Sequence, residues 1–352
     1  MSLGEVPPGR GPVPTKVSTP ADGTGHGPLD EADLAGVPAE GGRGPSQAQA
    51  PPAGGGVGAP IAVGARPRYA GRRRLEFLYF ALRNKKFLVG FGVEAIFVLA
   101  AIFGPMFAPF SDQQFAAPPF LHPSVHHLLG TTYFGEDVFS VLLYSLRDSY
   151  MVGFLGALFA GIIGLTIGFA AGWRGGLMDD ILQMFTNIVI MMPALVLLLV
   201  IGAYFKTHSV FFEGVFIGAT SWPWVARAVR AQTFTLRDRD FVDLARMSGK
   251  RGPSIVIKDI APNMASYLLL VFILLFAGSM LLAVSYDFLG LGPTNGVSLG
   301  DMMNKAELWS GLTLHMWWWF IPPGAVMTLI VAALYISNVG LDEVFNPKLR
   351  EL

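Results

Sequence analysis

Six long runs of apolar residues constrain the fold of this chain more than any other feature. The first, at 87–110, is long enough at the helical rise of about 1.5 Å per residue to cross a hydrocarbon core of about 30 Å. In the fourth run, Glu213 and Pro223 interrupt the apolar pattern, and Pro223 predicts a kink or an early end of that helix. We therefore predict an all-α, polytopic membrane protein with six transmembrane helices, at 87–110, 150–173, 181–205, 210–228, 264–286 and 317–340.

The composition favours the same class. Hydrophobic residues make up 52% of the chain and charged residues 14%, whereas soluble domains carry about a quarter charged residues. The formal net charge of zero gives no argument for nucleic acid as a partner. The chain contains no cysteine, which excludes disulfides, thiolate catalysis and cysteine-based metal sites.

The chain divides into three predicted parts. Residues 1–70 are rich in Gly, Pro and Ala and poor in residues that could form a core, so we expect a disordered tail. Residues 71–148 hold a basic segment, the first span and an outer loop. Residues 149–345 form a five-helix core that carries a polar loop at 229–263.

The distribution of Lys and Arg predicts the orientation of the spans. With a cytoplasmic tail, three basic residues fall on the outer side, namely Arg147, Lys206 and Lys305. The basic residues on the inner side lie at 72–86, at Arg174, at 227–258, and at Lys348 and Arg350. Both termini and the polar loop are therefore predicted to face the cytoplasm.

The segment 241–263 is the largest predicted cytoplasmic loop between spans. Apolar residues at helical spacing predict a helix that ends before Gly249, which can adopt the positive φ found just past helix ends. Pro253 suits the first turn of a second helix, and Pro262 is expected to end it. The residues alone are equally compatible with an ordinary cytoplasmic loop.

Three glycines form a row on the second span. Gly164, Gly168 and Gly172 lie four residues apart, and small residues at this spacing let helix backbones approach closely within lipid. We interpret the row as a helix-packing face rather than a dinucleotide-binding loop, which would need a preceding strand.

The sequence lacks the motifs of nucleotide binding through a P-loop and of zinc binding on a helix. The chain contains no G-x-x-x-x-G-K-[ST] or H-E-x-x-H motif and no Ser/His/Asp set that suggests hydrolysis, so we expect no cofactor, metal or catalytic set on it. His122, His126 and His127 cluster in an outer loop but lack acidic partners at ligand spacing. Glu94 is the exceptional carboxylate inside a span, and we favour an acid that faces the bundle or the interface over a proton-coupled transport residue.

Three stretches resemble permease subunits of binding-protein-dependent ABC importers of the dipeptide and oligopeptide (DppC/OppC) type. FVDLARMSGKRGPSIVIKDIAPN at 241–263 resembles the cytoplasmic EAA loop, HLLGTTYFGEDVFS at 127–140 resembles a motif after the first span, and FLGLG at 288–292 resembles the outer loop after the fifth. Together with RNKKFLVGFG, which begins at Arg83, the resemblance runs to the C-terminus.

The resemblance implies a type I ABC importer permease-like fold and a non-catalytic subunit in a prokaryotic plasma membrane. The implied partners are two ATPase subunits that carry ATP and Mg, a second homologous permease subunit in a heterodimer, an extracellular or periplasmic solute-binding protein, and the lipid bilayer. The implied substrates are di- or oligopeptides. Nickel or another small solute within the same family, a secondary transporter without an ATPase, and a membrane scaffold stay open as alternatives.

The resemblance also assigns residues to ATPase docking. Its apolar anchors would be Phe241, Leu244 and Ala245. The rim would comprise Arg239, Asp243, Arg246 and Arg251, and the turn and ending would be Gly249, Ile260 and Pro262.

Three departures from the family pattern are predicted near the outer face. Glu136 stands where Arg is usual, Ala283 stands where an acid is common, and 297–300 replaces a P-S-W-G-like stretch. We expect them to bear on the substrate and the binding protein more than on the EAA-like loop.

Overall fold

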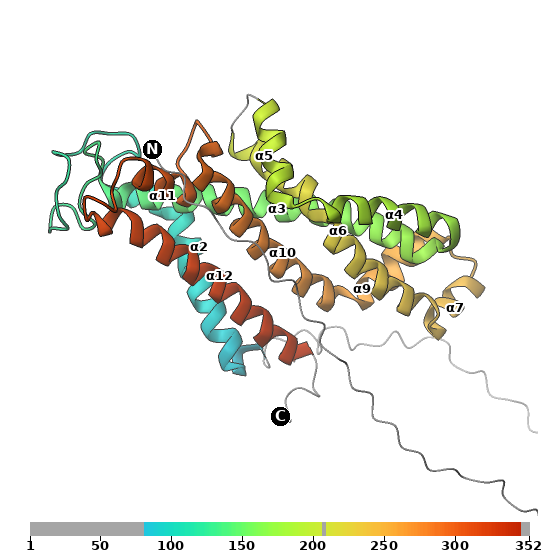
Figure 1. Ribbon diagram of the computed structural model, residues 1–352. Coiled ribbons are helices and arrows are strands. Elements are labelled where there is room, and N and C mark those ends of the chain that lie inside the picture. Colours follow the sequence, from blue (N-terminus) through green and yellow to red (C-terminus); the bar gives the residue numbers. More distant parts are fainter. Residues whose placement is uncertain (1–80, 206–208, 346–352) are drawn as a thin grey trace, which may run out of the picture. The chain divides into compact units, whose positions relative to one another are not determined.

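The computed structural model describes residues 81–205 and 209–345 (Figure 1). The predicted tail at 1–70, the basic residues at 72–74, Lys206, Lys348 and Arg350 lie outside the described residues. Within the described ranges, the β-type pairing is limited to one isolated bridge between Thr131 and Asp137. The prediction of an all-α fold is therefore confirmed for this part of the chain.

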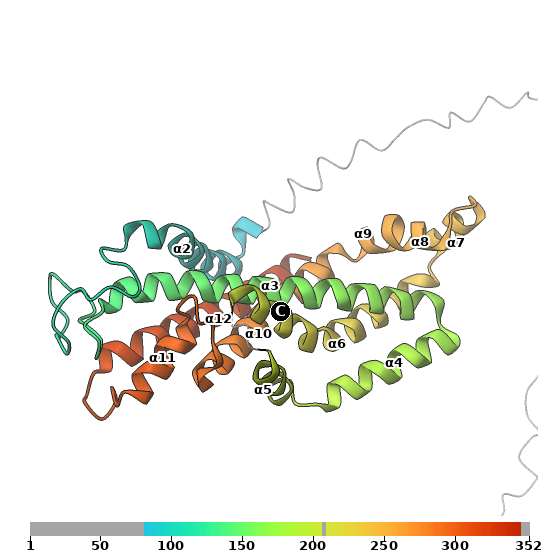
Figure 2. The same ribbon diagram turned by 90° about the horizontal axis from the view of Figure 1, so that it is seen from above.

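The helices follow the order α2 (Lys85–Phe107), α3 (Val138–Arg174), α4 (Gly176–Met191), α5 (Ala194–Tyr204), α6 (Val210–Arg237), α7 (Asp240–Met247), α8 (Gly252–Ile255), the π-helical η1 (Val256–Ile260), α9 (Ala261–Asn263), α10 (Ala265–Tyr286), the π-helical η2 (Asp287–Leu291), α11 (Leu299–Leu308) and α12 (Trp317–Phe345). The segment from α7 to α9 lies at one end of α3, and α11 lies at the other (Figures 1 and 2). We call these the α7 end and the α11 end.

Length and composition identify four helical segments that can cross a membrane, namely α2, α3, α12 and the segment Ala265–Leu291, which joins α10 to η2. Helices α4 and α5 add a fifth if they form one broken span, and they are bent by 82° at the break. The polytopic membrane class is confirmed, but the described residues give four to five spans on these criteria rather than six. The predicted span at 210–228 is not counted, because it lies in the more polar α6. The predicted span at 181–205 is counted only if the bent pair of α4 and α5 crosses the membrane as one span.

Of the kink or early end predicted at Pro223, the early end is wrong, because helix α6 continues to Arg237. The glycine row of α3 lies directly against it. A Cβ on Gly164 would lie 2.6 Å from Val225 Cβ, and a Cβ on Gly168 would lie 2.7 Å from the carbonyl oxygen of Ala226. Packing along this row continues past Pro223 and stabilises the helix despite the backbone hydrogen bond that proline removes.

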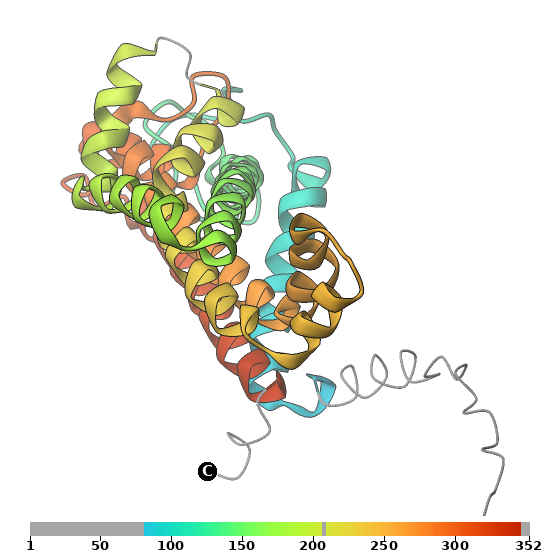
Figure 3. The ribbon, with the colours of Figure 1, turned by 90° about the vertical axis from the view of Figure 1, so that its right-hand side faces the viewer.

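Helix α3 begins at Val138, well before the predicted start at residue 150, because Asp137 caps it. The Asp137 side chain accepts a hydrogen bond from the backbone N–H of Ser140 at 2.9 Å. The helix thus runs through the predicted boundary between 148 and 149. It contacts α2, α4, α6, α10, α11 and α12, and Figure 3 shows it surrounded by the other helices.

Candidate functional site

The EAA-like segment forms a helix, a tight turn and a second helical stretch at the α7 end. Helix α7 terminates in a Schellman turn, in which the N–H of Gly249 donates to the carbonyl of Arg246 at 3.0 Å and the N–H of Lys250 donates to that of Ala245 at 3.2 Å. Gly249 has φ of +73°, so the prediction of a left-handed residue at this turn is confirmed.

The second stretch runs through α8, η1 and α9. Pro253 lies in its first turn, as predicted. Pro262 does not end the stretch immediately, since α9 reaches Asn263 and the helical path breaks at Met264. Before Pro262 the backbone widens into the π-helical η1, where the N–H of Ala261 donates to the carbonyl of Val256. The Asn263 side chain then donates to the carbonyl of Asp259 at 2.7 Å, which satisfies an acceptor near the proline.

The predicted apolar anchors do not share one face. The anchor Ala245 is 6% exposed and belongs to the chain's own core, as does Ile260 of the motif's ending, which is fully buried. Phe241 is half-buried and packs against the same cluster. Leu244, in contrast, is 61% exposed. Of this set, only Leu244 is available as an apolar contact for another molecule.

Two exposed apolar residues accompany Leu244, and sequence reasoning missed both. Met247 is 76% exposed and Ile257 is 69% exposed. Met247 follows Leu244 by three residues, a spacing that places both on one helix face and could have indicated the pair. Ile257 gives no comparable sequence signal, because the fold of η1 decides which of its isoleucines is buried. We call Leu244, Met247 and Ile257 the apolar triplet.

Some charged residues of the segment form ion pairs within the chain, and others are exposed to solvent. Asp243 and Arg246 form an ion pair at 2.9 Å, and the Arg246 guanidinium lies 5.2 Å from the ring centre of Trp173 at the end of α3. Lys250 pairs with Asp259 at 2.8 Å, a brace between the turn and η1 that sequence reasoning did not identify.

The remaining predicted docking residues lie at the surface. Arg239, Arg251, Gly249 and Pro262 are all exposed. They, together with the apolar triplet, are accessible to another molecule, whereas Arg246 also serves to hold α7 against α3.

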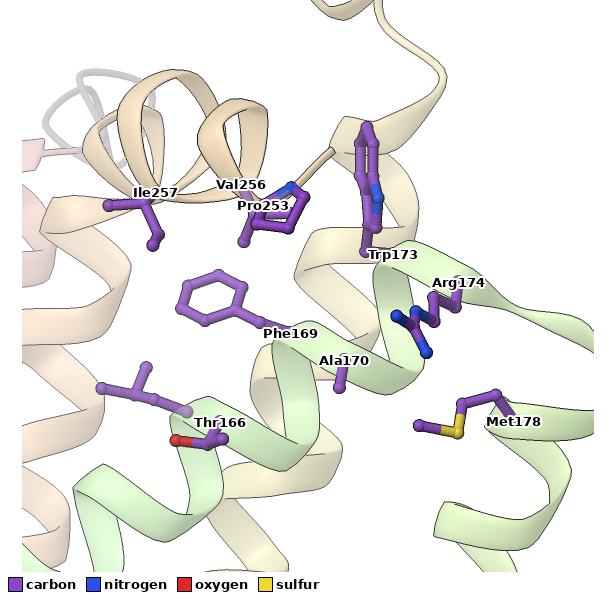
Figure 4. A pocket seen from close by; sticks show the side chains of 10 residues that line it. Thr166, Phe169, Ala170, Trp173, Arg174, Met178, Pro253, Val256 and Ile257 are labelled. Carbon is purple, nitrogen blue, oxygen red and sulfur yellow. The ribbon is translucent and has the colours of Figure 1, made fainter. Parts of the chain in front are cut away.

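An open groove of about 520 Å³ lies between this segment and the C-terminal part of α3 (Figure 4). Figure 4 shows the Phe169 ring facing Val256 and Ile257, with Trp173 beside Pro253. The backbone approaches Trp173 closely, since a Cβ on Gly252 would lie 2.7 Å from the indole nitrogen. The segment therefore contacts α3 at Trp173, and the groove lies between Ile257 and Phe169.

The family-like motif at 127–140 has a structural role at the α11 end. His127 Nδ1 lies 2.9 Å from one oxygen of Asp137, while the other oxygen accepts from the backbone N–H and the hydroxyl of Ser140. These contacts fasten the loop to the first turn of α3. Among the described residues, no group of three or more His, Asp or Glu side chains is arranged to hold a metal ion.

The residues that depart from the family pattern are buried or half-buried. Val297, Ser298 and Leu299 are 2% exposed or less, so this stretch packs inside the chain and is not available to a partner. Ala283 is also buried. Glu136 is half-buried, and this burial raises the pKa of its carboxyl group, although Thr132 donates to it at 3.1 Å.

Three carboxyl groups lie within the bundle. Glu94 accepts a hydrogen bond from the Tyr150 hydroxyl at 2.9 Å, which joins α2 to α3 and agrees with an acid that faces the bundle. Sequence reasoning missed the burial of Glu213 and Asp287, which are 5% and 1% exposed. It treated Glu213 as a mere interruption of an apolar run, because nothing in the local sequence shows that the start of α6 packs near η2.

Comparison with known proteins is consistent with the sequence resemblance. The family described as "Binding-protein-dependent transport system inner membrane component" matches residues 164–351, and the "N-terminal TM domain of oligopeptide transport permease C" matches 78–123. A protein of Brucella abortus named as a peptide transport system permease is 30% identical over 292 residues, covering 82% of this chain and 94% of the relative. The oligopeptide transport system permease protein OppC of Mycobacterium tuberculosis is 27% identical over 287 residues, covering 81% and 97%. The protein of the same name from Lactococcus lactis is 30% identical over 213 residues, covering 60% and 72%.

Proposed function

Because the chain belongs to the family of binding-protein-dependent transport system inner membrane components, we propose that it is the permease subunit of an ATP-driven importer of di- or oligopeptides. The peptide class is supported by the names of its relatives from Brucella, Lactococcus and Mycobacterium. The observation that carries the coupling role is the exposed apolar triplet on a short, braced helix–turn–helix at the α7 end.

The proposed assembly contains two ATPase subunits that bind ATP and Mg, a second homologous permease subunit in a heterodimer, and an extracellular or periplasmic solute-binding protein. The α7 end faces the cytoplasm of a prokaryotic cell, with both termini on that side, because the Lys and Arg residues concentrate there. Leu244, Met247 and Ile257 insert into the ATPase surface, and the exposed Arg239 and Arg251 set the register at the rim.

Motion of the ATPase passes to the spans through short connections. Helix α7 begins at Asp240, directly after α6 ends at Arg237, and α9 ends at Asn263 just before α10 begins at Ala265. The Schellman turn and the Lys250–Asp259 pair keep the two halves of the segment in a fixed relation. A displacement of α7 therefore moves α6 and α10 as packed units.

Substitution at Gly249 tests the coupling. No atom lies within 4 Å of a Cβ placed there, so Gly249→Val introduces backbone strain of about 1–3 kcal/mol without a steric clash. We expect Gly249→Val to insert normally and to lose substrate-stimulated ATP hydrolysis by the purified complex. Gly249→Asn, which tolerates positive φ, should retain most of this activity.

A matched control lies at another turn. Gly176 has φ of +57° and no atom within 4 Å of its Cβ position, so Gly176→Val imposes the same kind of strain outside the segment. Normal peptide uptake by Gly249→Val, or equal losses in Gly249→Val and Gly176→Val, would contradict the coupling role. Uptake of nickel but not of labelled peptides by the wild-type complex would contradict the substrate class.

A further inference from the structure

Two buried carboxyl groups, those of Glu213 and Asp287, face each other where the start of α6 meets η2. Neither residue is more than 5% exposed. The two carboxyl groups lie within reach of a hydrogen bond between them. The backbone encloses Asp287 closely, because a Cβ on Gly292 would lie 3.0 Å from Asp287 Oδ1 and a Cβ on Gly300 would lie 2.6 Å from Asp287 Cβ. We call Glu213 and Asp287 the acid pair.

Three oxygens of the acid pair lack a donor. Both carboxyl oxygens of Glu213 and Oδ1 of Asp287 are buried, and no hydrogen-bond partner reaches them among the described residues. An ionised carboxylate can only accept hydrogen bonds, so two ionised groups would leave all three oxygens unsatisfied and two like charges side by side. A single proton between the groups turns one of them into a donor and removes one of the two charges.

The titratable groups around the acid pair supply no free positive charge. Asp148 of α3 and Asp301 of α11 lie near it, and the neutral Tyr286 of α10 faces both of its carboxyl groups. The nearby basic residues belong to these aspartates, since Arg147 is the neighbour of Asp148 and Lys305 pairs with Asp301 at 2.9 Å. Within the described ranges, the surroundings therefore favour a neutral or singly charged acid pair over a doubly charged one.

The space beside the acid pair is too small for a hydrated ion. The cavity that Glu213 lines together with Tyr286, Gly292 and neighbouring apolar residues has a volume of about 10 Å³. A cavity needs roughly 10–15 Å³ to hold a single water molecule. The site therefore has room for a proton or for at most one water, but not for a cation with its hydration shell.

We propose that Glu213 and Asp287 share one proton, and that this proton holds the start of α6 against η2. The protonated carboxyl group donates a hydrogen bond to the ionised one, and the acid pair carries a single negative charge. When the proton leaves, two like charges remain in one buried space, and their repulsion moves α6 and η2 apart. The contact lies within this chain and needs no partner subunit.

Infrared spectroscopy of the full-length chain in mild detergent detects the proton directly. A protonated carboxyl group and a carboxylate absorb at different frequencies, so the difference spectrum between the wild type and Glu213→Gln should show the loss of one buried carboxylic acid. Asp287→Asn should lose the same band, because the proton belongs to both residues. Glu307→Gln is the matched control, since Glu307 is an exposed acid of α11, and it should keep the band.

The distance between α6 and η2 tests what the proton does. Spin labels at Phe211→Cys and Leu289→Cys, both exposed positions in a chain without cysteine, report this distance. With the acid pair intact, the distance should widen as the pH rises from about 5 to about 10. With Glu213→Gln it should stay short throughout, because an amide donates to Asp287 at every pH. Glu307→Gln should behave like the wild type.

A distance that does not change with pH while the acid pair is intact would overturn the proposal, and this measurement does not depend on whether Glu213→Gln folds. A difference spectrum without the carboxylic acid band would overturn it as well. If a cation neutralised both acids instead, either Lys206, which lies outside the described residues, or a bound ion, the distance would widen as the pH falls. That opposite dependence would replace the shared proton by a cation.

Discussion

Helix α6 meets α3 on one side and α4 on another, and the two contacts differ in kind. Against α3, the backbones themselves approach, since a Cβ on Gly172 would lie 2.7 Å from Thr233 Cβ. Against α4, a few side chains make the contact, and the buried residues of α4 are only Asp179 and Thr186 among the described residues. Helices α3 and α6 therefore cannot shift slightly against each other without steric overlap. Helices α4 and α6 can separate when a few side-chain interactions break.

The side chains between α4 and α6 are specific. Asp179 accepts two hydrogen bonds from Arg230, each at 2.5 Å, and Asn187 accepts one from Arg227 at 2.6 Å. Phe185 stacks on Trp222 with the ring centres 5.8 Å apart. Since α4 leads into the 82° bend before α5, a change at this contact would move that bend while α3 and α6 stay together.

The largest effect is expected from Gly168→Leu at the α3–α6 contact. The new side chain would meet the carbonyl oxygen of Ala226 at 2.7 Å, and a backbone atom cannot move aside as a side-chain tip can. We expect a loss of at least about 3 kcal/mol in stability and little folded protein in mild detergent. Thermal inactivation of the purified chain measures this, with Gly92→Leu as a control at a glycine that has open space. Equal stability of the two variants would show that the α3–α6 contact is not tightly packed.

A smaller effect is expected from Asp179→Asn at the α4–α6 contact. The amide keeps the shape of the carboxylate but loses the charge-assisted pair with Arg230, which should cost about 1 kcal/mol. Asp180→Asn is the matched control, because Asp180 is the exposed neighbour of Asp179 on the same helix.

The same variant should loosen α4. Spin labels at Leu177→Cys and Ala231→Cys, both exposed positions in a chain without cysteine, report the distance between α4 and α6. Asp179→Asn should broaden the distance distribution, whereas Asp180→Asn should not. An unchanged distribution in Asp179→Asn would show that the ion pair does not hold α4 in place.

The smallest effect is expected from Phe185→Ala. Phe185 is 53% exposed, so its truncation removes one stacked face against Trp222 and should cost about 0.5–1.5 kcal/mol. Met184→Ala, which removes a side chain that is 59% exposed on the same helix, should change the thermal inactivation temperature less. A larger loss in Met184→Ala than in Phe185→Ala would indicate that another surface of α4 holds it to the bundle.

In the EAA-like segment, the sequence predicted the local backbone structure but not which side chains are buried. The turn at Gly249 and the helix start at Pro253 follow from backbone chemistry that acts over a few residues, and both predictions are confirmed. The orientation of α7 depends on contacts with α3, which lies far away in sequence. The sequence could therefore predict the helix but not that Ala245 faces the core while Met247 faces outward.

The apolar runs, the missing nucleotide motif and the turn residues determined that this chain is a multi-pass helical membrane protein with a structured polar loop. Each depends on local chemistry, either the apolar length that a bilayer requires or the φ that a residue can adopt. Only the tertiary structure decided that α6 continues through Pro223, that Glu213 and Asp287 are buried, and that α4 and α5 meet at a bend of 82°. These features depend on which helices lie side by side, because burial is a property of neighbours that can be distant in the chain.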